Sequence, residues 1–309
     1  MLPSILGLCA WLSFFTTSVL ASPIQLSRRE ISSELLDDFR FFAQVAAVAM
    51  CDVNLNTTGR QLSCDKGPCE LVQADDTEIT SIYHGTAIAT GYIALDYTRK
   101  LILVTFRGTV TTADLYQDLR IPVFTDVSEI CEGCKAHTGF WNYWLSAKDQ
   151  VTAELRRLIK ENPSYSVVVT GYSLGAAVAT LAGTALRVDG FTLDVWTFGA
   201  PKTGNLKMAE FITQQHEPVS VYRATHHKDI IPAIPFISPG FDYTHPSPEY
   251  WIDQPSFETV TPDVVKVIEG INNQTGNAGQ RGRRILEEHE WYFGEMFIYN
   301  TPADFGAIF

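Results

Sequence analysis

The sequence contains little positive charge. Its 309 residues include 23 Lys and Arg against 35 Asp and Glu, which gives a formal net charge of −12 at pH 7. An acidic chain is repelled by phosphate backbones and by anionic lipid headgroups. The composition therefore argues against nucleic acid or an anionic membrane as a partner. The negative charge does not exclude an uncharged surface as a partner.

The chain also lacks internal repeats, low-complexity blocks and any linker long enough to separate two domains. With 46% hydrophobic and 19% charged residues, it is long enough to bury a sizeable core. We therefore predict a single globular domain over residues 30–309.

Long apolar runs are absent except at the N-terminus, where residues 5–20 carry no charge. This run ends at Val19-Leu20-Ala21, a small-residue cleavage pattern, and its short length predicts a secretory signal peptide over residues 1–21. Lys and Arg are missing before it, which departs from the usual signal.

Residues 22–29 end in a dibasic pair, Arg28 and Arg29, typical of processing in the secretory pathway. We predict a propeptide there and a mature chain that begins at Glu30 with a charge of −14.

Two sequons fit this secretory route. Asn56-Thr57-Thr58 and Asn273-Gln274-Thr275 are candidate N-glycosylation sites, whereas Pro302 interrupts the pattern that begins at Asn300. We therefore expect a secreted, extracellular glycoprotein that is not inserted in a membrane and acts as a monomer.

Cysteine is scarce, and after removal of Cys9 with the signal peptide an odd number remains. The pairs Cys64/Cys69 and Cys131/Cys134 are close enough in sequence to close small loops, so both are predicted disulfides and Cys51 is left over. The C-x-x-C spacing at 131–134 is also found in redox and zinc motifs. No second C-x-x-C and no His pair accompany it, so neither a metal nor a cofactor is expected.

Periodicity predicts helices alternating with strands. The expected elements are an amphipathic helix over 33–50, a strand pair over 92–95 and 101–106, a helix that ends before Pro163, strands over 165–170, 193–198 and 219–225, and helices after residue 173 and over 205–214. This order predicts an α/β fold with a mostly parallel sheet whose active site lies beyond the carboxyl ends of the strands. Residues 232–262 hold seven of the fifteen prolines, so we expect an irregular wall there and no interior strand.

A serine lies between two glycines at the end of one predicted strand. Gly171-Tyr172-Ser173-Leu174-Gly175 follows a β-branched run and precedes an Ala-rich helical run. This G-x-S-x-G pattern is typical of a nucleophile elbow, a sharp strand-to-helix turn that exposes the serine hydroxyl. The Leu174 N–H at the start of the helix is then placed to hold an oxyanion. The same pattern also arises in an ordinary tight turn with a hydrogen-bonded serine.

A serine hydroxyl needs an imidazole to take its proton and a carboxylate to orient that imidazole. On an α/β sheet of this kind the partners follow in the order Ser, acid, His. Asp194 begins a predicted strand and so lies at the end of the sheet opposite the expected active site. Asp229 follows the carboxyl end of a predicted strand and is the predicted acid. His245 and His289 come after it, and local sequence leaves both open as the base.

Several motifs together resemble the filamentous-fungal class 3 lipases of the Thermomyces and Rhizomucor type, a family related to mono- and diacylglycerol lipases and to feruloyl esterases. The match runs from about Ser33 to Gly294, and its motifs are Phe106-Arg107-Gly108-Thr109, Gly171 to Gly175, Thr225-His226-His227-Lys228-Asp229, Ser247-Pro248-Glu249-Tyr250-Trp251 and His289-Glu290-Trp291-Tyr292-Phe293-Gly294. The resemblance implies an α/β-hydrolase fold with a short helical lid. It also implies Ser173 as nucleophile, Asp229 as acid, His289 as base, and Thr109 and Leu174 as oxyanion-hole residues.

The resemblance places the lid at residues 111–120. Thr112, Leu115, Tyr116 and Leu119 fall there at helical spacing opposite charged and polar residues. An amphipathic helix of this kind covers a cleft in water and turns its apolar side to lipid. We therefore expect the substrate to be met at an oil–water interface.

The chain departs from the family pattern at three points. Tyr172 stands where the family usually has His, which we expect to alter local hydrogen bonding without changing the role of any triad residue. Leu115 replaces a Trp found in several lids. The last residues contain no cysteine to pair with Cys51, and relatives that lack this cysteine include lipases that prefer mono- and diacylglycerols.

The predicted function is a secreted serine carboxylic-ester hydrolase that cleaves tri-, di- or monoacylglycerols through an acyl-serine intermediate. A feruloyl esterase on the same scaffold is the alternative. The residues after the acid form an apolar wall that suits an acyl chain better than a polysaccharide, and an aromatic acid would also fit it. These residues are Ile230, Ile231, Ile234, Phe236, Ile237 and Phe241. A lipid-binding relative without catalysis is disfavoured because all three triad candidates are present.

Overall fold

The computed structural model describes residues 29–64, 69–84, 90–108, 123–215, 220–236 and 240–296. The lid prediction over 111–120 and the oxyanion candidate Thr109 lie outside these residues, as do the signal peptide and most of the predicted propeptide.

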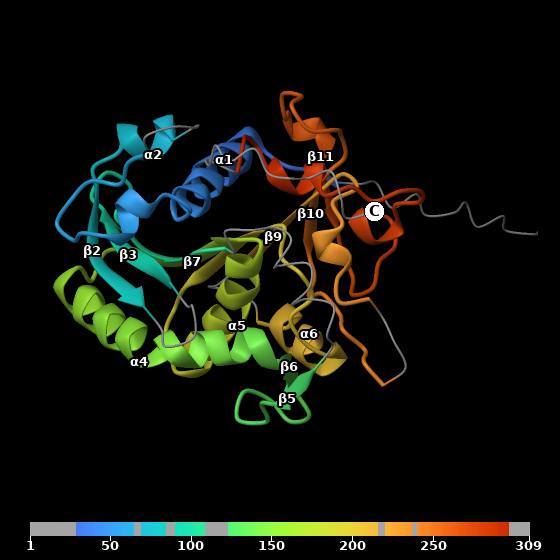
Figure 1. The fold of residues 1–309 in the computed structure, drawn as a ribbon, viewed down its shortest axis with the longest axis horizontal. Helices are drawn as coiled ribbons and strands as arrows, with labels where there is room; N and C mark the ends of the chain where they lie inside the picture. The colour runs from blue at the N-terminus through green and yellow to red at the C-terminus, as the bar shows by residue number, and fades with distance from the viewer. Residues whose placement is uncertain are drawn as a thin grey trace, which may run out of the picture.

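The centre of the described structure is a nine-stranded sheet in the order β1-β11-β10-β9-β8-β7-β4-β3-β2 (Figure 1). Adjacent strands from β4 through β7, β8 and β9 to β10 run parallel, and the pairs toward both edges are antiparallel. The strands are β1 (Arg29–Glu30), β2 (Thr77–His84), β3 (Thr90–Asp96), β4 (Leu101–Phe106), β7 (Ser166–Tyr172), β8 (Asp194–Phe198), β9 (Val221–His226), β10 (Glu249–Ile252) and β11 (Val265–Ile268). A separate hairpin consists of β5 (Phe124–Asp126) and β6 (Lys135–His137).

Helices cover both faces of the sheet (Figure 1). On one face lies α1 (Ser33–Val48), with the short α2 (Glu70–Ala74) beside it. The other face carries α4 (Thr138–Glu161), α5 (Leu174–Val188) and α6 (Leu206–Thr213). Each face has its own apolar core, and α5 is buried along almost its whole length because its small residues fit tightly against β7 and β8.

The predicted α/β architecture is confirmed. The strong periodic signals gave α1, β3, β4, β7, β8, α6 and β9 to within a few residues. Several elements were not predicted, among them α2, the β5–β6 hairpin and β11. The prediction gave only the end of the helix before Pro163; the helix begins at Thr138, because Phe140, Trp141 and Trp144 extend its buried face. The strand β2 was not predicted, because its burial alternates only in part and its register with β3 shifts between Ile79 and Ser81.

The prediction for residues 232–262 was wrong in one respect. This segment contains β10, which lies inside the sheet between β9 and β11. A proline is tolerated immediately before a strand, and Pro248 stands at that position before Glu249. The strand is only four residues long, so its pattern is too short to be distinguished from the irregular chain on either side.

Both predicted disulfides are present. Cys64 is joined to Cys69, and Cys131 is joined to Cys134, so the C-x-x-C pair is a structural cystine in this structure. Cys51 is buried and belongs to neither of these two disulfides. The cystine at 131–134 closes the turn of the β5–β6 hairpin.

Candidate active site

Ser173 occupies a sharp turn between β7 and α5. Its backbone lies in the left-handed region, with φ 57° and ψ −123°, and its N–H donates to the Phe198 carbonyl at 2.9 Å. Such a conformation is costly for a residue with a side chain and is kept where it positions a functional group. A Cβ at Gly171 would lie 2.4 Å from the Gly175 backbone, and a Cβ at Gly175 would lie 2.2 Å from the Phe106 oxygen. Both glycines of the motif are therefore required by the packing of the turn.

A continuous chain of hydrogen bonds begins at this serine. The Ser173 Oγ lies 2.8 Å from His289 Nε2, and His289 Nδ1 lies 2.7 Å from Asp229 Oδ2. All three side chains are buried, with Ser173 only 3% exposed. The structure thus brings together the three residues that the resemblance implied, from the loops after β7 and β9 and from the 3₁₀ turn η5 (Glu287–Glu290). Leu174 opens α5, so its N–H has no acceptor within the helix and stays beside the serine.

Asp229 is held by two further donors. The Ile231 N–H donates to Oδ1 at 2.8 Å, and the Tyr292 hydroxyl donates to Oδ2 at 2.5 Å. Burial, together with the Asp229 carboxylate, raises the pKa of Tyr292 well above 10, so its hydroxyl stays protonated and acts as a donor. Both carboxylate oxygens are therefore fixed, and Oδ2 is directed at the imidazole.

Tyr172 contacts His289 directly, in line with the expected change in local hydrogen bonding. Its ring stacks on the His289 imidazole with centroids 4.8 Å apart, and its hydroxyl donates to the His289 carbonyl at 2.8 Å. Burial raises the pKa of Tyr172 well above 10, which keeps this donor protonated. The residue in place of the usual His therefore supports both the ring and the backbone of His289.

The loop that carries His289 is anchored by its neighbour Glu288. One carboxylate oxygen lies 2.8 Å from His227 Nδ1, and the other accepts bonds from the Ser256 N–H at 3.0 Å and hydroxyl at 2.8 Å. Burial opposes ionisation of this carboxyl, but the hydrogen bonds from His227 and Ser256 hold the pKa of Glu288 below its usual value. The charged carboxylate thus ties together three loops beside the triad.

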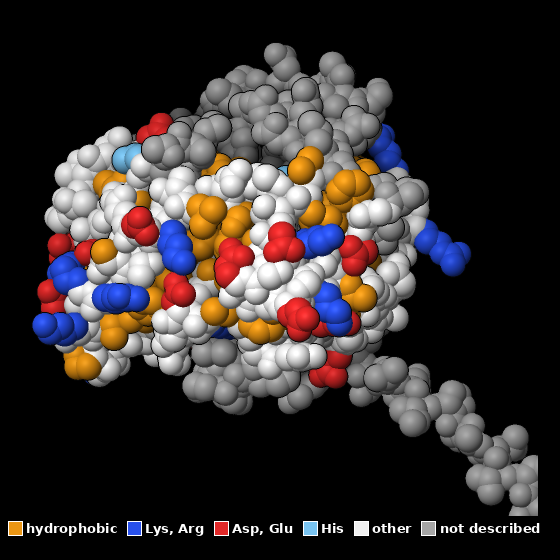
Figure 2. All heavy atoms as spheres, turned by 90° about the horizontal axis from the view of Figure 1, so that it is seen from below, with side chains coloured by type: hydrophobic (Ala, Val, Ile, Leu, Met, Phe, Trp, Pro, Cys, Tyr) orange, Lys and Arg blue, Asp and Glu red, His pale blue; other side chains and the backbone are white. Residues whose placement is uncertain are grey.

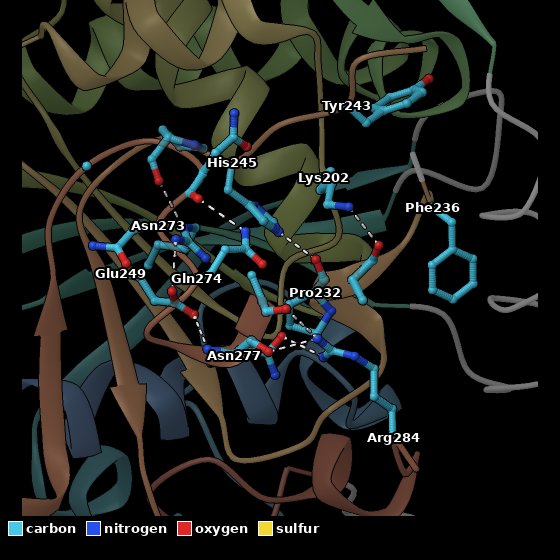
Figure 3. A pocket seen from close by; sticks show the side chains of 16 residues that line it. Lys202, Pro232, Phe236, Tyr243, His245, Glu249, Asn273, Gln274, Asn277 and Arg284 are labelled. Carbon is cyan, nitrogen blue, oxygen red and sulfur yellow. Dashed lines mark hydrogen bonds and ion pairs between the residues drawn. The ribbon is translucent and has the colours of Figure 1, made fainter. Parts of the chain in front are cut away.

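His245, the other candidate base, lies in a separate polar cavity of about 380 Å³ (Figure 3). Its Nε2 lies 2.7 Å from the Pro232 carbonyl, which makes it the donor of that bond. Burial and the nearby charges of Arg223 and Lys202 hold the pKa of His245 well below 6.5, so the ring is neutral. The structure therefore brings His289 to the serine and places His245 elsewhere.

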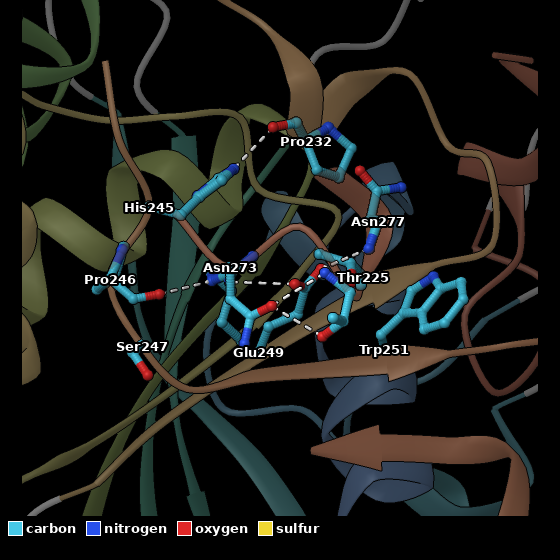
Figure 4. A network of polar contacts seen from close by, with 12 residues as sticks. Thr225, Pro232, His245, Pro246, Ser247, Glu249, Trp251, Asn273 and Asn277 are labelled. Carbon is cyan, nitrogen blue, oxygen red and sulfur yellow. Dashed lines mark hydrogen bonds and ion pairs between the residues drawn. The ribbon is translucent and has the colours of Figure 1, made fainter. Parts of the chain in front are cut away.

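The same cavity borders a polar network centred on Glu249 (Figure 4). The Thr225 hydroxyl and the Asn277 N–H both donate to Glu249, and the Asn277 amide also donates to the Asp229 carbonyl at 3.0 Å. Arg284 donates to that same carbonyl at 3.1 Å. This network fixes the backbone of Asp229 from the side opposite its carboxylate.

Comparison with known proteins identifies the family. Residues 103–238 match the model of the lipase (class 3) family. The chain is 38% identical to secreted mono- and diacylglycerol lipase A of Penicillium cyclopium, covering 94% of this chain and 97% of that one. It is 37% identical to secreted mono- and diacylglycerol lipase 1 of Fusarium solani, covering 86% and 78%. The chain belongs to the class 3 lipases.

A crystal structure of a mutant form of the Penicillium cyclopium lipase superposes on this lipase with a TM-score of 0.79 at 35% identity, covering 86% of this chain and 98% of that one. The predicted α/β-hydrolase fold is thereby confirmed. As a member of this family the protein is a carboxylic-ester hydrolase, and the comparisons give the feruloyl esterase alternative no support.

Acidic and basic side chains are intermingled with apolar ones over the face in Figure 2. None of the helices in the described ranges is long and apolar enough to cross a membrane.

The apolar residues predicted to form a wall after Asp229 differ in exposure. Ile230, Ile231 and Ile234 are buried in the core, and Phe236 is 51% exposed at the cavity in Figure 3. Ile237 lies outside the described residues.

Sequence reasoning missed several residues that build the site. Tyr292 and Glu288 flank His289 in the sequence, but nothing in their spacing indicates that they reach Asp229 or Ser256. Gly199, directly after β8, has a φ of 63°, and a Cβ there would lie 2.7 Å from His289 Cε1. The signal in the sequence that could have indicated Gly199 is its place directly after a predicted strand.

Proposed function

We propose that Ser173, His289 and Asp229 are the nucleophile, base and acid of a secreted lipase that cleaves mono- and diacylglycerols. The observation that carries this proposal is the buried chain of hydrogen bonds from Ser173 Oγ through His289 to Asp229, starting from a serine with a positive φ. Both named relatives described above are mono- and diacylglycerol lipases, which supports this choice of substrate.

The geometry supports an acyl-serine mechanism. Ser173 Oγ attacks the ester carbonyl carbon while His289 Nε2 takes its proton, and the imidazolium then gives that proton to the departing glycerol oxygen as its bond to the acyl carbon breaks. Water repeats the sequence on the acyl-serine and releases the fatty acid. Asp229 holds the imidazole in the tautomer that accepts at Nε2 and stabilises its charged form.

Stabilisation of the tetrahedral intermediate is assigned to Leu174 and Thr109. The Leu174 N–H lies at the first position of α5, where the helix leaves it unpaired. Removal of one oxyanion-hole donor typically costs about 2.7–4 kcal/mol of transition-state stabilisation. We retain residues 111–120 as a lid whose apolar side faces lipid at an oil–water interface.

Secretion and processing belong to the same proposal. Both named relatives are secreted proteins, and residues 1–21 have the pattern of a signal peptide. Cleavage after Arg29 would remove the first residue of β1, which pairs with Val267. N-terminal sequencing of the secreted protein tests the position of the cut. We further propose a monomer with glycans at Asn56 and Asn273.

Rates on monoacylglycerol, diacylglycerol and triacylglycerol emulsions, with methyl ferulate as a control substrate, test this function. We expect the first two to be hydrolysed fastest and Ser173→Ala to lose activity by a factor on the order of 10⁴ or more in kcat while remaining folded. Faster turnover of methyl ferulate than of every acylglycerol would overturn the proposed substrate class. Activity of Ser173→Ala within tenfold of the unmutated enzyme would overturn the proposed nucleophile.

A further inference from the structure

Phe257 combines two unfavourable features. Its side chain is 81% exposed, and its backbone has a φ of 69°, in the left-handed region. That region is uncommon for bulky residues and favours glycine and asparagine. An exposed phenylalanine in this conformation contributes little to folding, because the ring is not buried and the backbone is strained.

The turn that presents Phe257 is firmly held. Gln254 Nε2 donates to the Glu258 carbonyl at 3.2 Å and closes the turn. On the residue before Phe257, the Ser256 N–H and hydroxyl both donate to the buried Glu288 carboxylate. The outward position of the ring is therefore fixed by its neighbours on both sides, as a built feature of the fold.

The turn lies at the same edge of the sheet as the active site. It follows β10, and β10 runs parallel with β9, β8 and β7, so it leaves the sheet at the carboxyl edge where Ser173 follows β7. The bonds from Ser256 reach Glu288, the residue before His289. The turn that carries the exposed ring is therefore tied to the loop of His289 and lies at the same edge of the sheet as Ser173.

We propose that Phe257 is an interfacial anchor that inserts into the surface of a neutral acylglycerol phase and orients the active site toward it. An exposed aromatic ring gains free energy when it leaves water for an apolar phase. Asp253 and Glu258, both exposed, lie on the same turn and disfavour an anionic surface. The inference rests on the proposed acylglycerol function.

The experiment measures binding without turnover, in chains that also carry Ser173→Ala. Partitioning onto triolein droplets coated with phosphatidylcholine is measured by flotation for the parent, Phe257→Asn, Phe257→Trp and Val188→Asn. Asparagine tolerates the left-handed backbone, so this variant removes the ring without adding strain. The control residue, Val188, is 43% exposed and ends α5, the helix that leads away from Ser173 toward the opposite edge of the sheet.

We expect Phe257→Asn to bind about tenfold more weakly, which corresponds to about 1.4 kcal/mol. Phe257→Trp and Val188→Asn should stay within about twofold of the parent, and the Tm of Phe257→Asn should not fall below that of the parent. Phosphatidylglycerol added to the coat should not strengthen binding.

Three results would overturn the inference. They are partitioning of Phe257→Asn within twofold of the parent, a lowered Tm that marks the ring as structural, and failure of the parent to bind the neutral droplets. Hydrolysis by the unmutated enzyme tests the proposed function separately, because the binding assay involves no turnover.

Discussion

Gly199→Ala adds a single methyl group beside the imidazole of His289, the proposed base. Gly199 follows β8 with a φ of 63°, and its new Cβ would lie 2.7 Å from His289 Cε1, 2.9 Å from Nδ1 and 3.0 Å from the Tyr292 hydroxyl. Carbon atoms in ordinary contact are about 3.5–4.0 Å apart. The imidazole must therefore move by about 0.8 Å or more, away from the position in which it bridges Ser173 and Asp229.

The expected losses follow from this displacement. A misplacement of about 1 Å in a catalytic group costs about 10²-fold in rate, so kcat should fall by about that factor. Stability should fall as well, by about 1–2 kcal/mol for a Cβ in the left-handed region and by about 1–3 kcal/mol for the overpacked contact. The loss of rate is specific to this position, whereas the loss of folding free energy from a Cβ at positive φ is expected at any glycine with such a backbone.

Gly190→Ala is the matched control. Gly190 lies just after α5 with a φ of 91°, and a Cβ there would meet no atom within 4 Å. It should therefore lower the Tm through the backbone alone and leave kcat on dissolved p-nitrophenyl butyrate nearly unchanged. A kcat for Gly199→Ala within threefold of the unmutated enzyme would refute the steric reasoning, and so would an equal loss of kcat in both variants.

Three further expectations follow from the structure. His289→Ala should lose kcat on the scale of the serine variant, whereas His245→Ala should lose far less; the opposite order would contradict our choice of base. Thiol titration in denaturant without reductant should find one thiol per mature chain, Cys51, and zero thiols would mean a different pairing. Because the pKa of His245 lies well below 6.5 in the folded state, the unfolded chain binds the extra proton and stability falls as the pH drops below 6.5. In urea unfolding at pH 7 and pH 5, His245→Gln should show a smaller loss than the unmutated enzyme, and an equal loss would exclude this histidine as a source.

Sequence reasoning succeeded where a pattern was long or sterically demanding. The parallel order of β7, β8 and β9 follows from strands separated by helices, and the elbow at Ser173 follows from two glycines that no other residue can replace. It failed for β10, whose four residues acquire their structure by pairing with β9 and β11. A strand so short is determined by its neighbours in space, and single-sequence patterns do not record them.

The choice between the two histidines shows the same limit. Both lie among aromatic residues after Asp229, and their local sequences do not distinguish a base from a packed ring. The two histidines differ in their tertiary surroundings. His245 lies near Arg223 and Lys202 at the polar cavity, and His289 reaches Ser173 from a turn sixty residues beyond Asp229. The family resemblance supplied the information that the local pattern lacked.

The contact between Tyr172 and the triad was, by contrast, open to prediction. Side chains alternate between the two faces of a strand, so the residue before the serine points to the face opposite α5. That face carries α1, and its core also contains Trp291 and Tyr292 from the chain that follows His289. Since His289 must approach the serine from outside α5, the chain that carries it passes over the residue before the nucleophile. A substitution at position 172 is therefore expected to act on His289, which the tyrosine found here contacts through a stacked ring and a hydroxyl bound to the His289 carbonyl.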